Sequence, residues 1–340
     1  MLPKKPLPVF LIVIIDLLGI GALLVVFVLF HHILRLDSST PLQNIVFNQT
    51  PAPTAEATAV LEAEQPSATA EITPTPEPTP TPEPGDFSAT FPSDEPVEEG
   101  ENIIGSYVTD NLRLVVTEEH TDDATYFVAD VWIRNITEFK TAMSHDTFGR
   151  GYYTMPNSMA EDHNAVLALS GDCYGARTQG IVIRNGALYR DTVSGDVCIL
   201  YADGVMETYY ESEFNLEDAI ARSAYQGWSF GPKLIDNGEV PESFNTTDAI
   251  IAHNPRSAIG YYEPGHYCLV TVDGRQSGYS RGMTLSELSE LFIALGCVDA
   301  YNLDGGQSAM MTFDGNIVNQ PYHGGRAISD IIYFGGDDVV

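Results

Sequence analysis

The chain has 340 residues and a formal net charge of −31 at pH 7, with 47 acidic and 16 basic side chains. This length is sufficient for one large domain or two small ones. The excess of negative charge excludes a nucleic acid as partner, because binding a phosphate backbone requires a basic surface. Much of the charge lies in residues 37–100, so it says less about the binding site of the domain that follows.

An apolar segment over residues 9–30 follows Lys4 and Lys5. A helix needs about 20 residues to cross a bilayer, whereas a cleavable signal has an apolar core of only about 7–15. The lysines favour a cytoplasmic N-terminus over residues 1–8. We therefore expect an uncleaved, single-pass signal anchor in the lipid bilayer of the cell membrane. The rest of the chain would then be extracytoplasmic.

Residues 37–100 form a low-complexity segment rich in proline, threonine and glutamate, with a Thr-Pro repeat over residues 73–84. Proline fixes φ and removes a hydrogen-bond donor, which favours an extended polyproline II conformation. We expect a disordered linker that acts as a semi-rigid spacer between the membrane and a domain over residues 103–340.

The composition from residue 103 onward predicts an α+β fold. Residues 112–116 and 126–133 are rich in β-branched and aromatic side chains and predict strands. Asn185-Gly186 between two apolar runs predicts a hairpin. Residues 284–295 predict a helix, with a capping box at the start and a glycine after the end. A second helix is expected from Asn215. The sheet should be largely antiparallel or mixed, with a few helices.

The four cysteines are Cys173, Cys198, Cys268 and Cys297. Their spacing contains no Cys-x-x-Cys, which argues against a zinc knuckle. An even number of cysteines in an extracytoplasmic domain permits two disulfides. Of the three pairings we favour Cys173–Cys198 with Cys268–Cys297, and buried free thiols are the alternative.

Polar residues follow apolar strands or glycines at four places in the domain. These are Ser170-Gly171-Asp172, Asn254-Pro255-Arg256, Asp273-Gly274-Arg275-Gln276, and Asn302-Leu303-Asp304-Gly305-Gly306-Gln307-Ser308. Loops at strand ends are where binding sites tend to lie, and glycines allow backbone N–H groups to approach a ligand. A strand–helix–strand passage from Asp273 to Asp304 would bring both carboxylates to one cleft if the strands lie parallel.

Three carboxylates and two arginines suit the cleavage of a sugar–phosphate linkage. Breaking a glycosidic bond requires stabilisation of an oxocarbenium-like transition state, often with a second carboxyl group. An arginine fork binds phosphate well. Arg256 or Arg275 would hold the phosphate while Asp304 or Asp273 serves the sugar carbon. Two alternatives stay open: an ordinary turn at Asp304, and carboxylates that bind a divalent cation such as Ca²⁺, the identity of any metal being unknown.

The domain resembles the phosphodiester glycosidase family, and several segments in order carry the resemblance. They are residues 168–172, 180–186, 230–234, 254–260, 272–275, 282–288 and 302–308. The resemblance implies an α+β fold, hydrolysis of a sugar–phosphate diester, and a site at Asp172, Arg256, Asp273, Asn302, Asp304, Gly305, Gly306 and Ser308. We expect no cofactor, with a divalent cation as the open alternative. The chain departs from the family at Ser170, where asparagine is usual, and at Gln307 and Ala309, where glycine and serine are common.

We therefore expect a membrane-anchored hydrolase that cleaves the glycosidic bond of a sugar-1-phosphate diester. Its partner would be a phosphodiester-linked glycan or a sugar-phosphate polymer of the cell wall or exopolysaccharide. Asp304, Asp273 and Asp172 are the catalytic candidates. The substrate-binding candidates are Arg256, Arg275, Asn302, Gly305, Gly306, Gln307, Ser308 and Ser170. A non-catalytic glycan-binding module and a metal-dependent phosphodiesterase are the alternatives. A serine hydrolase using Ser308 is disfavoured, because the Gly-x-Ser-x-Gly elbow is missing.

Overall fold

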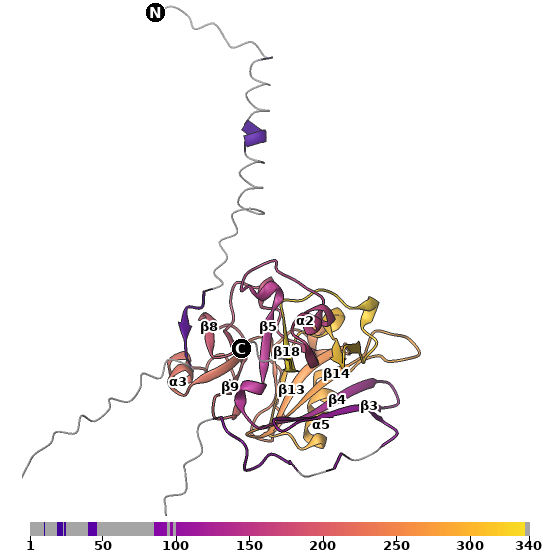
Figure 1. Cartoon of the computed structure of the whole chain (residues 1–340). Coiled ribbons are helices and arrows are strands. Elements are labelled where there is room, and N and C mark those ends of the chain that lie inside the picture. The colour runs from indigo at the N-terminus through magenta and orange to yellow at the C-terminus, as the bar shows by residue number, and fades with distance from the viewer. Residues whose placement is uncertain are drawn as a thin grey trace, which may run out of the picture. The chain divides into compact units, whose positions relative to one another are not determined.

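The structure is a computed structural model that describes residues 10, 19–22, 24, 40–45, 85–93, 96–97 and 100–336. The chain divides into two compact units, residues 1–38 and residues 39–340 (Figure 1). The described residues of the first unit are helical. Within the described ranges, no helix has the length and apolar character to span a bilayer. Most of the predicted anchor and linker lies outside the described residues.

The second unit is built from three sheets and a few short helices. The strands are β1 (Gln43–Asn44), β2 (Ile103–Val108), β3 (Leu112–His120), β4 (Thr125–Ile133), β5 (Lys140–Met143), β6 (Ala165–Ser170), β7 (Val182–Arg184), β8 (Ala187–Arg190), β9 (Val197–Tyr201), β10 (Met206–Tyr209), β11 (Ala224–Trp228), β12 (Lys233–Ile235), β13 (Arg256–Glu263), β14 (His266–Val272), β15 (Asp299–Asn302), β16 (Met311–Phe313), β17 (Asn316–Ile317) and β18 (Asp330–Gly335). The helices are α2 (Pro156–Asp162), α3 (Leu216–Ala221), α4 (Asp248–Ile251) and α5 (Leu285–Leu295), with 3₁₀ turns η2 (Ile136–Glu138), η3 (Ser144–Asp146), η4 (Tyr174–Ala176), η5 (Gly306–Ser308) and η6 (Tyr322–Gly324).

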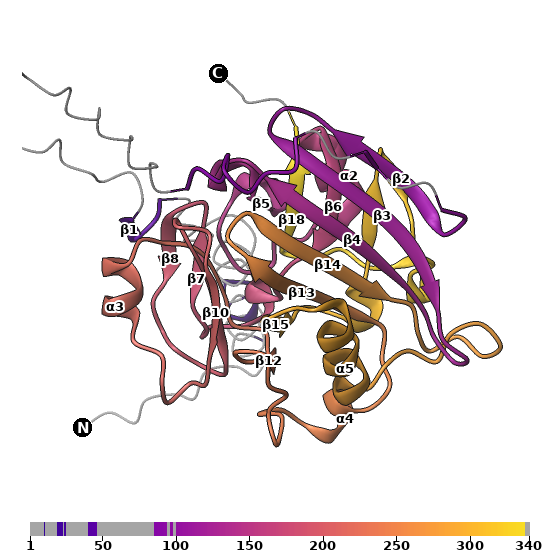
Figure 2. The same ribbon diagram turned by 90° about the horizontal axis from the view of Figure 1, so that it is seen from below.

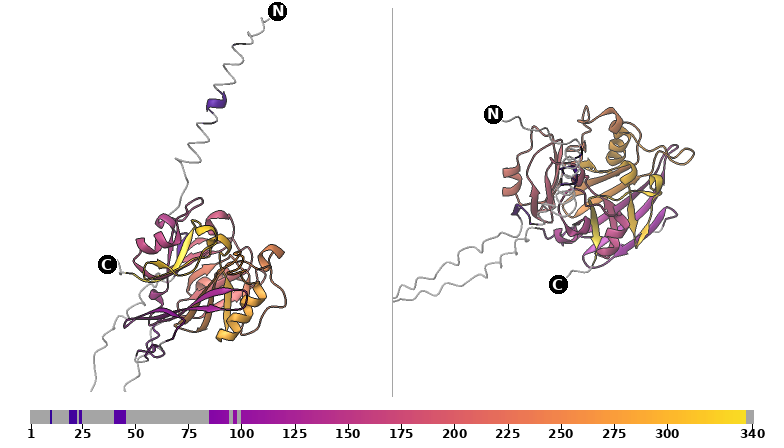
Figure 3. Two further views of the ribbon diagram at one scale, coloured as in Figure 1. Left: turned by 90° about the vertical axis from the view of Figure 1, so that its right-hand side faces the viewer. Right: turned by 90° about the horizontal axis from the view of Figure 1, so that it is seen from above.

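The strand pairs within each sheet are antiparallel, which confirms the predicted α+β class with a largely antiparallel sheet. The sheet orders are β1-β8-β7-β11-β9-β10, β12-β15-β13-β14-β4-β3-β2 and β17-β16-β6-β18-β5. Figure 2 shows the C-terminal strand β18 between β5 and β6, so the end of the chain completes a sheet begun much earlier. The views in Figure 3 show the same C-terminal strands beside those of the middle of the chain.

Local sequence signals account for the elements that were predicted. β3 and β4 contain the two expected strands, and Asn185-Gly186 forms the β7–β8 turn with positive φ at both residues. Thr284 and Glu287 form a reciprocal capping box at the start of α5, and Gly296 ends the helix with φ 89°. Asn215 caps α3 through its side chain.

The main core lies where the three sheets meet. Phe139 packs edge-on against one aromatic ring from each sheet, Trp228, Tyr267 and Phe334, at centroid distances of 6.1, 5.2 and 5.0 Å. Helix α5 covers the other face of the seven-stranded sheet with its buried leucines and Phe292. This packing joins the three sheets through one shared core.

Both ends of the predicted linker range lie on the domain. Leu42 and Ile45 donate backbone hydrogen bonds to Leu188 and Gly186, which adds β1 to the edge of β8. After the undescribed residues 46–84, Phe87 is buried in the core and its N–H donates to the carbonyl of Arg134 at 2.7 Å. The globular unit therefore includes residues 40–45 and 85–91 in addition to the expected range 103–340.

The four cysteines are free thiols in the structure, so the favoured pairing is not present. Cys198 is buried in the main core, whereas Cys173 lies in the loop after β6, close to Asp172 and Asp304. The other predicted pair does come together: the Sγ atoms of Cys268 and Cys297 are 3.5 Å apart and buried.

We expect Cys268 and Cys297 to form a disulfide when the protein is held under oxidising conditions, because only a small movement closes the bond to about 2 Å. Closing a loop of this size should stabilise the domain by about 3–4 kcal/mol. The measurement is the intact mass, by the loss of two hydrogens, together with denaturant unfolding with and without reductant. In the Cys297→Ser variant the free energy of unfolding should no longer depend on reductant, whereas in the Cys173→Ser variant it should still do so.

Candidate active site

The candidate site forms at one edge of the seven-stranded sheet. β14 and β15 both pair antiparallel with β13, so they run parallel to each other on either side of it. Asn302 at the end of β15 and the residues after β14 therefore lie at the same edge as Arg256, the first residue of β13. The condition that the two strands lie parallel is therefore met, although β13 separates them.

Loops from the other two sheets complete the site. The N–H of Asp304 donates to the carbonyl of Gly171, which follows β6, at 3.0 Å. The side-chain amide of Asn302 donates to the carbonyl of Gly231, just after β11, at 2.7 Å. These two bonds fix the segment 302–304 between three sheets.

A pocket of about 350 Å³ opens at this junction. Its lining includes six of the predicted residues and two that the sequence did not single out. They are Arg256, Arg275, Asn302, Gly305, Gly306 and Gln307, with Phe230 and Arg326 in addition. A concave site with a few converging polar groups and one aromatic wall is the usual form of a small-ligand site.

Two glycines let the chain line this pocket closely. A Cβ on Gly305 would lie 2.5 Å from the carbonyl oxygen of Pro255, so no side chain fits there. Gly306 has φ 64° and donates its N–H to the same carbonyl at 2.8 Å. The Gly-Gly pair thus presses the loop of Asp304 against the segment that carries Arg256.

Arg256 is a buried cation braced by backbone carbonyls. Its Nε donates to the carbonyl of Met283 at 2.9 Å, and its Nη2 donates to the carbonyls of Ile250 and Ala252 at the end of α4. Burial, together with the charge of Arg275, lowers its pKa to about 10, so it stays protonated at neutral pH. No carboxylate bonds to it in the described chain. The pocket therefore contains a fixed positive charge.

Arg275 is the second cation of the pocket. It has φ 59°, a left-handed conformation that is costly for a residue with a side chain and that is often kept for a functional reason. Its Nη2 and Nε donate to Oδ1 of Asn254 at 2.6 and 3.2 Å, and no ion pair with a carboxylate is formed within the described residues. The guanidinium lies next to Gly306. Arg275 is thus better placed than Arg256 to bind an anion.

Asn302 supplies an unused acceptor. Its side chain is buried, and with the amide nitrogen bonded to Gly231 its Oδ1 has no partner among the described residues. Because a buried acceptor without a donor is costly, the pocket favours a ligand that presents a hydroxyl or N–H group there.

Asp304 lies beneath Arg326 at the rim of the pocket. Nη2 of Arg326 is 3.2 Å from both carboxylate oxygens, and its Nε donates to Oγ of Ser308 at 2.6 Å. Burial raises the pKa of Asp304, the Ser308 hydroxyl and the charge of Arg326 oppose that rise, and the nearby carboxylate of Asp172 adds to it. A carboxyl group with a raised pKa beside a pocket is a candidate acid–base group.

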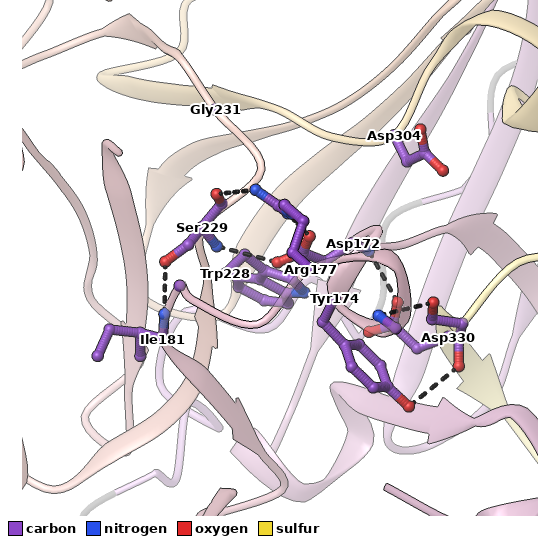
Figure 4. A network of polar contacts seen from close by, with 12 residues as sticks. Asp172, Tyr174, Arg177, Ile181, Trp228, Ser229, Gly231, Asp304 and Asp330 are labelled. Carbon is purple, nitrogen blue, oxygen red and sulfur yellow. Dashed lines mark hydrogen bonds and ion pairs between the residues drawn. The ribbon is translucent and has the colours of Figure 1, made fainter. Parts of the chain in front are cut away.

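Asp172 belongs to a separate network of polar contacts, and Asp304 lies outside its dashed hydrogen bonds and ion pairs (Figure 4). Arg177 forms an ion pair with Oδ1, and the N–H of Ser229 donates to Oδ2 at 3.0 Å. The N–H of Asp172 donates to Asp330, which is fully buried and paired with the buried Arg184 at 2.7 Å. Burial raises the pKa of Asp330 to about 6, against the opposing charge of Arg184.

Cys173 lies near both Asp172 and Asp304. Burial, and then these two carboxylates, raise the pKa of the Cys173 thiol to about 12. A thiol with such a pKa is neutral at physiological pH, which argues against a nucleophilic role.

Asp273 and Ser170 do not line the pocket, which corrects the expected cleft of Asp273 and Asp304. The carboxylate of Asp273 is fully buried and accepts from Asn319 and Gln320 at 2.8 Å and from Tyr279 at 2.9 Å. Ser170 is also buried and donates to the carbonyls of Ser308 and Met310. Both residues hold loops around the site.

No metal centre is built from the residues that the structure describes, since no group of three or more His, Cys, Asp or Glu side chains converges there. The three candidate carboxylates are instead bound by arginine, hydroxyl, amide and N–H donors. These donors satisfy the carboxylate oxygens.

Sequence reasoning missed Arg326, Arg177 and Phe230. Arg326 lies 22 residues after Asp304, and the Gly324-Gly325 turn signal before it did not link it to the site. A weak signal did exist for Phe230: it opens the segment 230–234 that contributes to the family resemblance.

The fold and pocket define an α+β domain with a cationic site next to buried carboxylates. The chain belongs to the phosphodiester glycosidase family, whose model matches residues 163–335. It is 30% identical over 259 residues to the SPbeta prophage-derived uncharacterized protein YomE of Bacillus subtilis strain 168, covering 68% of this chain and 40% of that protein. It is 35% identical over 79 residues to the N-acetylglucosamine-1-phosphodiester alpha-N-acetylglucosaminidase of Bos taurus, covering 23% of this chain and 14% of that one.

Solved structures show the same fold. The zebrafish N-acetylglucosamine-1-phosphodiester alpha-N-acetylglucosaminidase catalytic domain, auto-inhibited by its pro-peptide, matches with a TM-score of 0.53 at 18% identity, over 66% of this chain and 84% of that chain. A hypothetical protein from Synechocystis matches with a TM-score of 0.52 at 14% identity, over 66% and 62%. At these identities the likeness is one of fold alone. The chain spans less than half the length of the two curated relatives.

Proposed function

We propose that this protein hydrolyses the glycosidic bond of a sugar-1-phosphate diester. The observation that carries the proposal is that Arg256 and Arg275, two cations without a carboxylate partner among the described residues, line one pocket, and that the buried Asp304 lies next to this pocket behind Arg326. An electropositive pocket is unexpected in a chain with a net charge of −31, and it suits a phosphodiester anion. The names of the bovine and zebrafish relatives support the same substrate class.

The chemistry follows from the placement of the groups. Arg275 binds the phosphate, which departs readily as an anion and needs little proton donation. Asn302 accepts a hydrogen bond from the sugar, and Phe230 offers it an apolar wall. Asp304 serves the anomeric carbon, where positive charge develops in the transition state. The change at Ser170 does not weaken this proposal, because its side chain is turned away from the pocket.

Hydrolysis in water labelled with ¹⁸O tests the reaction class. A glycosidase places the label in the released sugar, whereas a phosphodiesterase places it in the phosphate product. A glycan-binding module gives neither product. Two results would contradict this proposal and favour a metal-dependent phosphodiesterase. One is ¹⁸O label in the phosphate product, and the other is activity that a chelator removes and a divalent ion restores.

Arg275→Ala should raise KM for the diester by about ten- to a hundredfold, because a charge-assisted hydrogen bond to the phosphate is lost. The measurement is steady-state kinetics with product analysis. Arg222→Ala is the matched control, since Arg222 pairs with Asp203 and Glu207 outside the pocket. An unchanged KM would remove Arg275 from the binding site.

We also propose that residues 9–30 anchor the protein in the cell membrane, with the domain outside the cytoplasm. The apolar length of this segment and the lysines before it support the anchor. The substrate would then be a sugar-phosphate polymer of the envelope. Labelling of engineered cysteines with a membrane-impermeant reagent in intact cells tests the orientation.

A further inference from the structure

Arg326 covers the carboxylate that the proposed reaction requires. The Arg326 side chain is 48% exposed and lines the pocket, whereas the Asp304 side chain is 7% exposed and does not. A reacting carboxylate must come within about 3–3.5 Å of its target atom. In this arrangement the guanidinium occupies that space.

The surroundings of Arg326 allow it to move. It lies in a loop after Gly324 and Gly325, which both have positive φ. Only Nε and Nη2 are bonded, to Ser308 and Asp304, and Nη1 has no partner among the described residues. Moving further into the pocket would bring Arg326 toward two other cations, Arg256 and Arg275. Their repulsion opposes the movement until an anion arrives.

We propose that Arg326 is a substrate-displaced cover: the phosphodiester anion draws its guanidinium away from Asp304 and so exposes the carboxylate. This inference rests on the proposed function and assigns Arg326 a role in selecting substrates. A diester brings the anion that uncovers Asp304. A neutral glycoside lacks that anion, and the carboxylate stays paired.

The displacement has a consequence for protons. The groups facing Asp304 are Arg326, Ser308 from η5, and Asp172 with Cys173 from the loop after β6. Arg326 is the cation that directly contacts the carboxylate, and its charge lowers the pKa of Asp304. Its departure must therefore raise that pKa further, and the protein takes up protons as the anion binds.

Calorimetry of the full chain with dimethyl phosphate, a phosphodiester that does not itself titrate in this range, measures the uptake. Titrations in buffers of different ionisation enthalpy, from about pH 4 to about pH 8, give the protons bound at each pH. We expect the wild type to take up more protons at the pH of maximum uptake than the Arg326→Gln variant. In the variant there is no Arg326 charge to be displaced, so only the charge of the bound anion raises the pKa of Asp304. Equal uptake, or no binding, would overturn the proposal.

A second test is to measure the kinetics on two substrates that carry the same sugar. One is a methyl phosphodiester and the other is a neutral nitrophenyl glycoside. Arg326→Gln should lower kcat/KM for the diester by about ten- to a hundredfold, and leave it equal or higher for the neutral glycoside. An equal loss on both substrates means that Arg326 merely positions Asp304. Arg281→Gln, a side chain of similar exposure at 49%, is the control and should change neither.

The two proposals fail in different ways. If the wild type releases no sugar but binds dimethyl phosphate with the expected uptake, the glycosidase proposal fails and the displacement stands. If the wild type is active and the Arg326→Gln variant matches it on both substrates, the displacement fails alone.

Discussion

Asp304→Asn should lower kcat for hydrolysis of a sugar-1-phosphodiester by about 10²–10⁴-fold, the usual contribution of a positioned acid–base or nucleophilic carboxylate. The substitution keeps the shape of the side chain and removes its charge. KM should change little, because the phosphate is bound by Arg275 rather than by Asp304. The measurement is product release at saturating substrate, with circular dichroism and the unfolding midpoint as checks on the fold.

The control for this variant is Asp314→Asn. Asp314 is an exposed turn residue with φ 48°, a conformation that asparagine adopts equally well. It should retain full activity. Full activity in Asp304→Asn would show that Asp304 takes no part in the reaction.

Asp330→Asn should destabilise the domain by about 3–5 kcal/mol, because it leaves the Arg184 guanidinium buried without a counter-charge. Asp330 is fully buried, and its oxygens also accept from the N–H of Asp172. Urea unfolding, with the slope compared between variants, measures the loss. A large part of it should return in the double variant Arg184→Met with Asp330→Leu, which removes both charges.

The surface pair Asp203–Arg222 provides the comparison. Both side chains are substantially exposed, and Asp203→Asn should cost at most about 1 kcal/mol. If the two asparagine variants lost equal stability, burial would not set the energy of the Arg184–Asp330 pair.

The sequence predicted the elements whose causes are local. A capping box and a stop glycine define α5, and an Asn-Gly turn defines the β7–β8 hairpin. The same holds for the loop of Asp304, where Gly305 is needed for close approach to Pro255 and Gly306 has a positive φ. Strand ends also predicted correctly that Arg256, Arg275 and Asn302 would line one pocket.

The errors concern side chains whose partners lie far along the chain. Asp273 was expected in the cleft, but Asn319 and Gln320 reach it from 46 and 47 residues later and bury it. The contact between Arg184 and Asp330, which are 146 residues apart, was not predicted either. A single strand pattern gives the face on which a residue lies but not the loop that folds over it, so neither contact could be predicted from local sequence.

The docking of β1 onto β8 changes what the proline-rich segment can do. Residues 40–45 and 85–91 both lie on the same domain, so residues 46–84 start and finish on one body. Because both flanking segments are bound to the same domain, residues 46–84 form a loop of that domain. Lengthening this loop would not increase the distance between the domain and residue 40.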